Sequence, residues 1–127
     1  HPRTSFVAGF IGLANIVKGK VVAREGGRLE LETALGRLAA AAGDSTAAPG
    51  DEVCFSFRPE SMALYKEESA NKVRGTILYS IFMGDVTDLF VDANGVRLRA
   101  HAESAAAFKP GDVVDFAVAE SAFQILG

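Results

Sequence analysis

Few side chains in this sequence are of the types that catalyse reactions or bind metal ions. The chain has two histidines, His1 and His101, and one cysteine, Cys54, and none of the three lies at the spacing of metal ligands or of a nucleophile and its base. The one Gly-Lys pair, Gly19-Lys20, lacks the preceding glycine of a phosphate-binding loop. We therefore predict no catalytic, cofactor-binding or metal-binding residue in this chain.

Two carboxylates, Asp85 and Asp88, are candidates for holding a hard cation through oxygen ligands. Two are too few for such a site, and Asp is common in turns because its side chain bonds to nearby backbone groups. We therefore expect both to lie in a turn between two strands. His101 lies in a segment of alternating polarity, so we expect it to face solvent in a structural role.

A second polar group, Arg58 and Glu60, follows a predicted strand and flanks Pro59. Proline ends a strand ladder, and residues two apart can share a face. One interpretation is a surface ion pair worth at most about 1 kcal/mol. The other is a docking contact with a neighbouring domain, and both stay open.

Charge and composition disfavour some classes of partner. Lys and Arg number 13 and Asp and Glu 16, for a formal net charge of -3. Such a chain has no basic field to neutralise nucleic-acid phosphates, so we expect no nucleic-acid partner. The most apolar stretch, residues 6–17, is shorter than the roughly 18–20 residues that cross a bilayer. The chain begins His1-Pro2-Arg3, which suggests a piece of a longer polypeptide.

The elements that would position these side chains are mostly strands. Apolar residues at helical spacing predict one short helix within residues 1–15. From Ile16 onward the apolar period falls to about two, with runs broken by Gly, Asp, Asn and Pro. The predicted strands are 16–24, 28–33, 37–41, 52–57, 72–83, 85–92, 96–102, 113–119 and 123–126.

Internal repetition is the most informative feature of the chain. Residues 15–21 (NIVKGKV) recur as residues 71–77 (NKVRGTI), and residues 49–53 (PGDEV) as residues 110–114 (PGDVV). These matches keep their order along the chain, so a unit of roughly 60 residues is used twice. The second copy carries a small insertion around residues 83–88.

Five short strands per copy suit an OB-like barrel, which leaves few exposed sheet edges. We therefore predict an all-β fold of two small barrels, with repeats at about 16–66 and 71–127. A single-strand nucleic-acid binder of this fold would need exposed aromatic rings. The relevant rings, on Phe55, Phe57, Phe90 and Phe116, are expected to face the core.

A pocket between the two barrels, or between two chains, could hold a small ligand, because concave junctions often do. The polar candidates for lining it are Ser69, Asn71, Thr87 and Ser121. Each of them also has a structural interpretation.

Four segments resemble a known family. Residues 6–15 (FVAGFIGLAN) and 57–61 (FRPES) are similar, in this order, to the C-terminal region of ATP-binding subunits of binding-protein-dependent ABC importers. Residues 75–100 and the turn at residues 110–112 (PGD) are similar to the rest of that region. The resemblance covers essentially the whole chain and is greatest for the polyamine and ferric-iron branch. It implies that residues 1–15 join an absent nucleotide-binding domain to a transport-associated OB (TOBE) region, related to molybdate-binding MOP barrels, at residues 16–127.

The resemblance implies a regulatory, dimer-stabilising accessory domain rather than an enzyme. Its partners would be its own nucleotide-binding domain, a second copy of the subunit and, indirectly, the membrane subunits. It would lie in the cytoplasm at the inner face of the membrane. ATP and Mg²⁺ would belong to the absent N-terminal domain of a transport ATPase, and this fragment would hold no cofactor.

The alternative function is a sensor of small ligands or oxyanions such as molybdate or sulfate. Residues 69–71 (SAN) resemble the first segment of the oxyanion site in related barrels, without its Arg, and residues 118–121 (VAES) resemble a late strand without its Lys. Glu120 would oppose an oxyanion rather than neutralise it.

Overall fold

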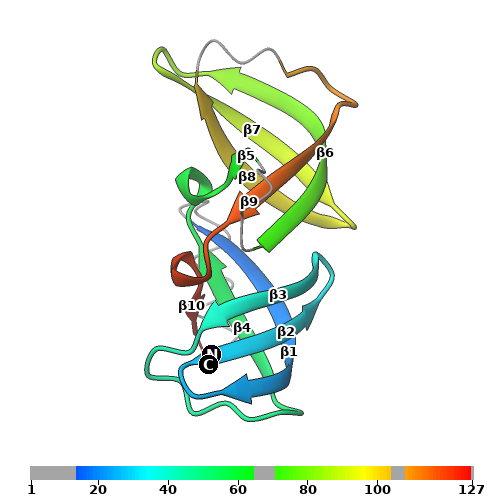
Figure 1. The fold of residues 1–127 in the computed structure, drawn as a ribbon. Helices are drawn as coiled ribbons and strands as arrows, with labels where there is room; N and C mark the ends of the chain where they lie inside the picture. Colours follow the sequence, from blue (N-terminus) through cyan, green and yellow to red (C-terminus); the bar gives the residue numbers. More distant parts are fainter. Residues whose placement is uncertain (1–13, 65–70, 104–107, 127) are drawn as a thin grey trace.

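The computed structural model describes residues 14–64, 71–103 and 108–126, most of which lie in strands and tight turns (Figure 1). The elements are β1 (Asn15–Glu25), β2 (Arg28–Thr33), β3 (Gly36–Ala41), β4 (Glu52–Phe57), the 3₁₀-helix η1 (Pro59–Ser61), β5 (Ala63–Leu64), β6 (Asn71–Phe82), β7 (Val86–Ala93), β8 (Val96–Glu103), β9 (Val113–Val118), the 3₁₀-helix η2 (Glu120–Ala122) and β10 (Gln124–Ile125). Within these ranges no helix is long and apolar enough to cross a membrane.

Two antiparallel five-stranded sheets, each curled into a half-barrel, lie one above the other (Figure 1). The first has the order β10-β4-β1-β2-β3 and the second the order β5-β9-β6-β7-β8. The two orders correspond strand by strand, except that the short end strands are exchanged. β10 pairs with β4 of the first sheet, and β5 pairs with β9 of the second. The predicted all-β fold with two small OB-like barrels is confirmed.

The nine predicted strands are all present, with ends that differ by one residue at most. The tenth, β5, was not predicted, because two residues are too few to show an alternating pattern. Residues 1–13 of the predicted N-terminal helix lie outside the described residues, and Asn15 already begins β1. The repeat limits of about 16–66 and 71–127 stay a prediction.

The second hairpin is longer than the first, where the sequence predicts an insertion. β7 has 8 residues where β2 has 6, and β6 has 12 where β1 has 11. The β6–β7 hairpin closes through the Met83 N–H, which donates to the Val86 carbonyl at 2.8 Å. This end of the second sheet therefore has no counterpart of equal length in the first.

The repeated Pro-Gly-Asp segments form the same turn before β4 and before β9. Gly50 and Gly111 have φ of 98° and 92°, a conformation that residues with a Cβ rarely adopt. The N–H of the residue before each proline donates to the Asp51 or Asp112 carboxylate, at 2.8 and 2.9 Å. Proline followed by a positive-φ glycine is the signature of a type II turn. The sequence match at these positions therefore reflects a shared backbone geometry.

The core fills the inside of both half-barrels and continues across the junction between them. Alternate residues of β2 and β7, such as Leu31 and Leu89, are fully buried. Phe123, just after η2, packs edge-on against both Phe55 and Phe57, with ring centroids 5.2 Å apart in each case. The exchange of β10 thus brings an aromatic ring from the end of the chain into the first barrel.

Gly75 on β6 allows β7 to lie against it without a side chain between them. A Cβ at this position would overlap the Cγ1 methyl of Val91, a residue that is itself fully buried. At Gly19, the matching glycine of β1, the nearest atom to such a Cβ would be Cγ2 of Thr33 at 3.1 Å. The second barrel is therefore packed more tightly at this point than the first.

We predict that Gly75→Ala lowers the free energy of unfolding by about 1–3 kcal/mol, because the added methyl group overpacks the core. Gly27→Ala is the matched control, since a Cβ there would meet nothing within 4 Å. Urea denaturation followed by circular dichroism measures both. Equal stability of the two variants would contradict the close approach of Val91 to Gly75.

Candidate site at the junction of the two sheets

Two buried asparagines join the sheets at the waist of the molecule. Asn15 is the first residue of β1 and Asn71 the first residue of β6, so they occupy matching positions in the two halves. Their exposed fractions are 5% and 4%. A buried amide must find partners for its donors and its acceptor, and both side chains reach the backbone of the opposite sheet to find them.

Asn71 pairs with the backbone of β3. Its Nδ2 donates to the Ala39 carbonyl at 2.9 Å and to the Val118 carbonyl at 3.0 Å, and its Oδ1 accepts from the Ala39 N–H at 2.8 Å. β3 is the edge strand of the first sheet, and its outward backbone groups lack a neighbouring strand. The amide of Asn71 therefore takes the place of one residue of that missing strand.

Asn15 makes the reciprocal pair with β8, the edge strand of the second sheet. Its Nδ2 donates to the Arg99 carbonyl at 2.9 Å, and its Oδ1 accepts from the Arg99 N–H at 2.8 Å. The sulfur of Met62 lies 3.8 Å from the same Nδ2. Since each amide is occupied by backbone, the arrangement holds the sheets together and leaves neither amide free to bind a ligand.

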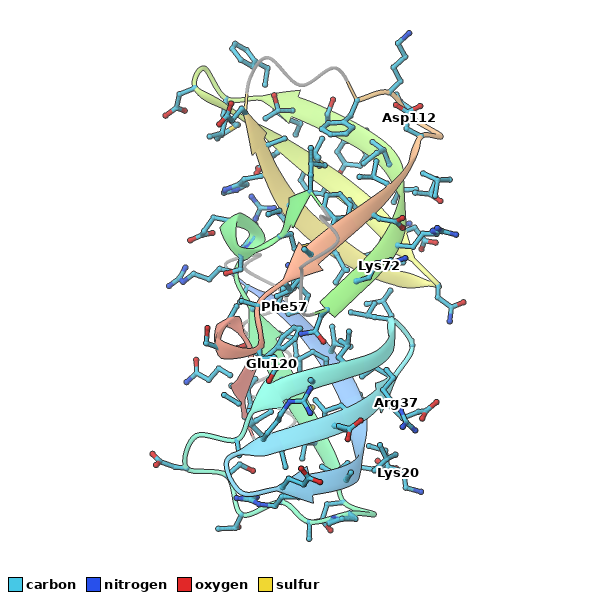
Figure 2. The ribbon with its side chains drawn as sticks, viewed as in Figure 1. Lys20, Arg37, Phe57, Lys72, Asp112 and Glu120 are labelled. Atoms are coloured by element: carbon cyan, nitrogen blue, oxygen red, sulfur yellow. The ribbon has the colours of Figure 1, made fainter. Side chains whose placement is uncertain are left out.

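An ion pair reinforces this waist, where Figure 2 labels Glu120 and Phe57. Arg28 on β2 donates through Nε and Nη2 to the Glu120 carboxylate of η2, at 2.9 and 3.3 Å. This hydrogen bond and the charge of Glu120 raise the pKa of Arg28. From the sequence, Glu120 was expected to repel an oxyanion. In the structure its carboxylate is the partner of the Arg28 guanidinium, which belongs to the other half of the molecule.

The predicted contact residues Arg58 and Glu60 flank the buried Pro59 and are both exposed. η1, which contains Glu60, packs against β8. Among the described residues, Arg58 and Glu60 form no ion pair with each other, so the surface ion-pair interpretation is wrong there. Their docking role stays a prediction.

The three predicted pocket residues that the structure describes do not gather at one place. Ser69 lies outside the described residues, and Asn71 is in the junction. Thr87 is buried on β7, opposite Ala102 of β8. Ser121 is exposed and lines a groove of about 970 Å³ between the β3–β4 loop and β10, which includes neither Asn71 nor Thr87. A ligand pocket made by these side chains stays a prediction.

A polar cluster on the outer face of the second sheet was missed. Asp88 is not in a turn but on β7, only 6% exposed, with Arg99 Nη2 2.7 Å from its Oδ2. His101 does not simply face solvent, because its Nε2 lies 2.7 Å from Asp88 Oδ1. In the described structure no other donor reaches Oδ1, so this contact is a hydrogen bond only when His101 carries a proton on Nε2. The signal in the sequence was the β7–β8 hairpin, whose register places Asp88 directly opposite His101.

Phe90 also lies on this outer face, which corrects the expectation that it faces the core. Its ring stacks on Tyr79 with centroids 4.4 Å apart, and the Arg99 guanidinium lies 5.5 Å from its centroid on the other side. The three residues are direct cross-strand neighbours on β6, β7 and β8. A bulge in β6 between Ile77 and Tyr79 shifts the pairing, and the sequence pattern did not show it.

We predict that Asn71→Ala lowers the free energy of unfolding by about 1–3 kcal/mol, because it leaves the buried N–H and C=O of Ala39 without partners. Asn15→Ala should have a similar effect through Arg99. Gln124→Ala removes an exposed amide and should change stability by less than about 0.5 kcal/mol. Chemical denaturation compares the three variants. Asparagine variants as stable as the Gln124 variant would show that these hydrogen bonds do not hold the junction.

Comparison with known proteins agrees with this architecture. The chain is 38% identical over 122 residues to the spermidine/putrescine import ATP-binding protein PotA of Rubrobacter xylanophilus, an alignment that covers 91% of this chain and 32% of that protein. It is 34% identical over 127 residues to PotA of Pseudomonas aeruginosa, covering 91% of this chain and 35% of that protein. The chain therefore spans about a third of the length of these relatives.

A solved structure, the cytoplasmic molybdate-binding protein ModG with molybdate bound, has a TM-score of 0.78 and 20% sequence identity, covering 87% of this chain and 94% of that one. At this identity the likeness concerns the fold alone. The sequence profile described as the TOBE domain matches residues 56–126, more than half of the chain. This match, together with two half-barrels that exchange their short end strands, shows that the chain belongs to the TOBE domain family.

Proposed function

We propose that this chain is the C-terminal accessory domain of the ATP-binding subunit of an ABC importer for a polyamine or a similar small solute. The observation that carries the proposal is the similarity to spermidine/putrescine import ATP-binding proteins along 91% of the chain. The role of the domain is structural and regulatory. The occupied amides of Asn15 and Asn71 support this role, since they make the junction a rigid connection.

The partners follow from the same proposal. The domain packs against its own nucleotide-binding domain, which precedes it, and helps to hold two copies of the subunit together at the inner face of the membrane. ATP and Mg²⁺ bind in the preceding domain, and the whole subunit hydrolyses ATP. The domain itself contributes packing surfaces rather than chemistry.

The proposal predicts a phosphate-binding loop upstream of His1 in the reading frame that encodes this chain. It also predicts that removing residues 16–127 from the longer subunit lowers transport-coupled ATPase activity about tenfold, a usual size for coupling between domains. ATP hydrolysis by the importer in vesicles, with and without its solute-binding protein, measures this effect. A frame without the loop would refute the proposed function.

A second function, oxyanion sensing, has support from the fold likeness to ModG. The junction opposes it, because Asn71 is fully engaged and the nearby guanidinium of Arg28 is already paired with Glu120. Calorimetric titration of the chain with molybdate and sulfate, and with spermidine and ferric iron as further probes, separates the two functions. We expect no saturable heat from molybdate or sulfate, and a 1:1 isotherm with either would favour the sensor.

A further inference from the structure

The β2–β3 and β7–β8 hairpin turns of the two halves touch each other (Figure 1). Ala34 and Asn94 are matching residues, because each is the first of two residues between paired strand ends. Asn94 Nδ2 donates to the Ala34 carbonyl at 2.9 Å. We call this hydrogen bond the turn tether; it joins the two halves at a place other than the buried asparagines of the waist.

Asn94 differs chemically from the other two asparagines of the chain, Asn15 and Asn71, because it alone precedes a glycine. The backbone nitrogen of a following residue can attack the side-chain amide carbon of an asparagine, and glycine obstructs this attack least because it has no Cβ. A Cβ at Gly95 would meet nothing within 4 Å, and both Asn94 and Gly95 are exposed. The turn is therefore open to this reaction and to water, whereas Asn15 and Asn71 are buried.

Both reacting groups are held by hydrogen bonds in the folded chain. Ala34 holds the Asn94 amide, and the Gly95 N–H donates to Asp92 Oδ2 at 3.4 Å. Asn94 and Gly95 have φ of 51° and 88°, the two positive values of a type I′ turn, which fixes the backbone between them. Before they react, the amide must leave Ala34 and the Gly95 nitrogen must turn from Asp92 toward the amide carbon. The two hydrogen bonds therefore slow the reaction without preventing it.

We propose that Asn94 is a site of spontaneous modification, at which cyclisation onto Gly95 removes the turn tether. The Gly95 nitrogen forms a bond to Asn94 Cγ and gives up its proton, while the Cγ–Nδ2 bond breaks and ammonia leaves with that proton. Solvent water then adds to one of the two carbonyls of the succinimide ring and opens it to aspartate or isoaspartate. No group is oxidised or reduced. The inference is independent of the proposed function.

The products cannot restore the turn tether. An ionised carboxylate has only acceptor oxygens, so it cannot donate to the Ala34 carbonyl. Its negative charge would also lie beside the carboxylate of Asp92, which already faces this turn. The hydrogen bonds of Asn15 and Asn71 remain. The modification therefore separates the two hairpin turns and leaves the waist of the molecule joined.

Rates of modification in the 127-residue chain test the inference. After incubation in mildly alkaline buffer, peptide mapping by mass spectrometry should detect aspartate and isoaspartate at Asn94 and neither product at Asn15 or Asn71. A peptide of residues 91–98 lacks Ala34 and should react about two- to tenfold faster, the ratio expected for loss of a hydrogen bond of this kind.

Two substitutions separate the hydrogen bonds that restrain the reaction. Asp92→Ala releases the Gly95 N–H and should raise the rate at Asn94 about twofold, the lower end of that range, because this hydrogen bond is long. Asp44→Ala is the matched control, since it removes an exposed carboxylate from the β3–β4 loop, and it should leave the rate unchanged. Circular dichroism verifies that both variants keep the fold.

Hydrogen exchange measures what the modification does to the contact between the turns. The modified chain carries an added negative charge, so ion-exchange chromatography isolates it, and its amides at residues 33–36 should exchange faster than in the unmodified chain. Asn94→Gly should show the same increase, because Gly-Gly also suits a type I′ turn but has no amide to reach Ala34.

Three results would overturn the inference. The first is a chain unmodified at Asn94 when the peptide has reacted fully, and the second is an equal rate in the chain and the peptide. The third is a modified chain in which residues 33–36 exchange no faster than before.

Discussion

The fold depends on two amide side chains that complete the edges of two sheets. A curled five-stranded sheet leaves the outward N–H and C=O groups of its last strand without partners, and burying them that way is costly. Asn15 and Asn71 solve this problem reciprocally, each from the first residue of a long strand, β1 or β6, to the edge strand of the other sheet. The buried polar contacts between the halves are thus made by the first residues of β1 and β6.

This arrangement explains why the junction is a poor place for a ligand and a good place for a rigid connection. The amides are saturated by backbone groups, and the nearby Glu120 is held by Arg28. Two sheets joined by such a rigid junction can transmit the position of one attached domain to another. The face that remains chemically distinctive is the outer surface of the second sheet, where the two halves no longer resemble each other.

Much of this fold could be predicted from the sequence, because repeated turn and strand signals occur in the same order twice. The Pro-Gly-Asp turns and the alternating apolar residues fix strand positions closely. The exchange of β5 and β10 could not be predicted, since a two-residue strand has no period and its partner is set by tertiary packing. The stacking of Phe90 on Tyr79 was also inaccessible, because one bulge in β6 changes which side chain lies beside Phe90 across the sheet. The pairing of Asp88 with His101, by contrast, follows from the regular β7–β8 register around the Asn94-Gly95 turn.

The exchanged strand β10 has a consequence for how the chain folds during its synthesis. Its partner β4 is made about 70 residues earlier, and Phe123, which packs on Phe55 and Phe57, also comes near the end. Contacts between such distant parts of a chain slow folding, because a long loop must close before they form. The first barrel is therefore complete only when β10 has joined β4, which couples the folding of the two halves.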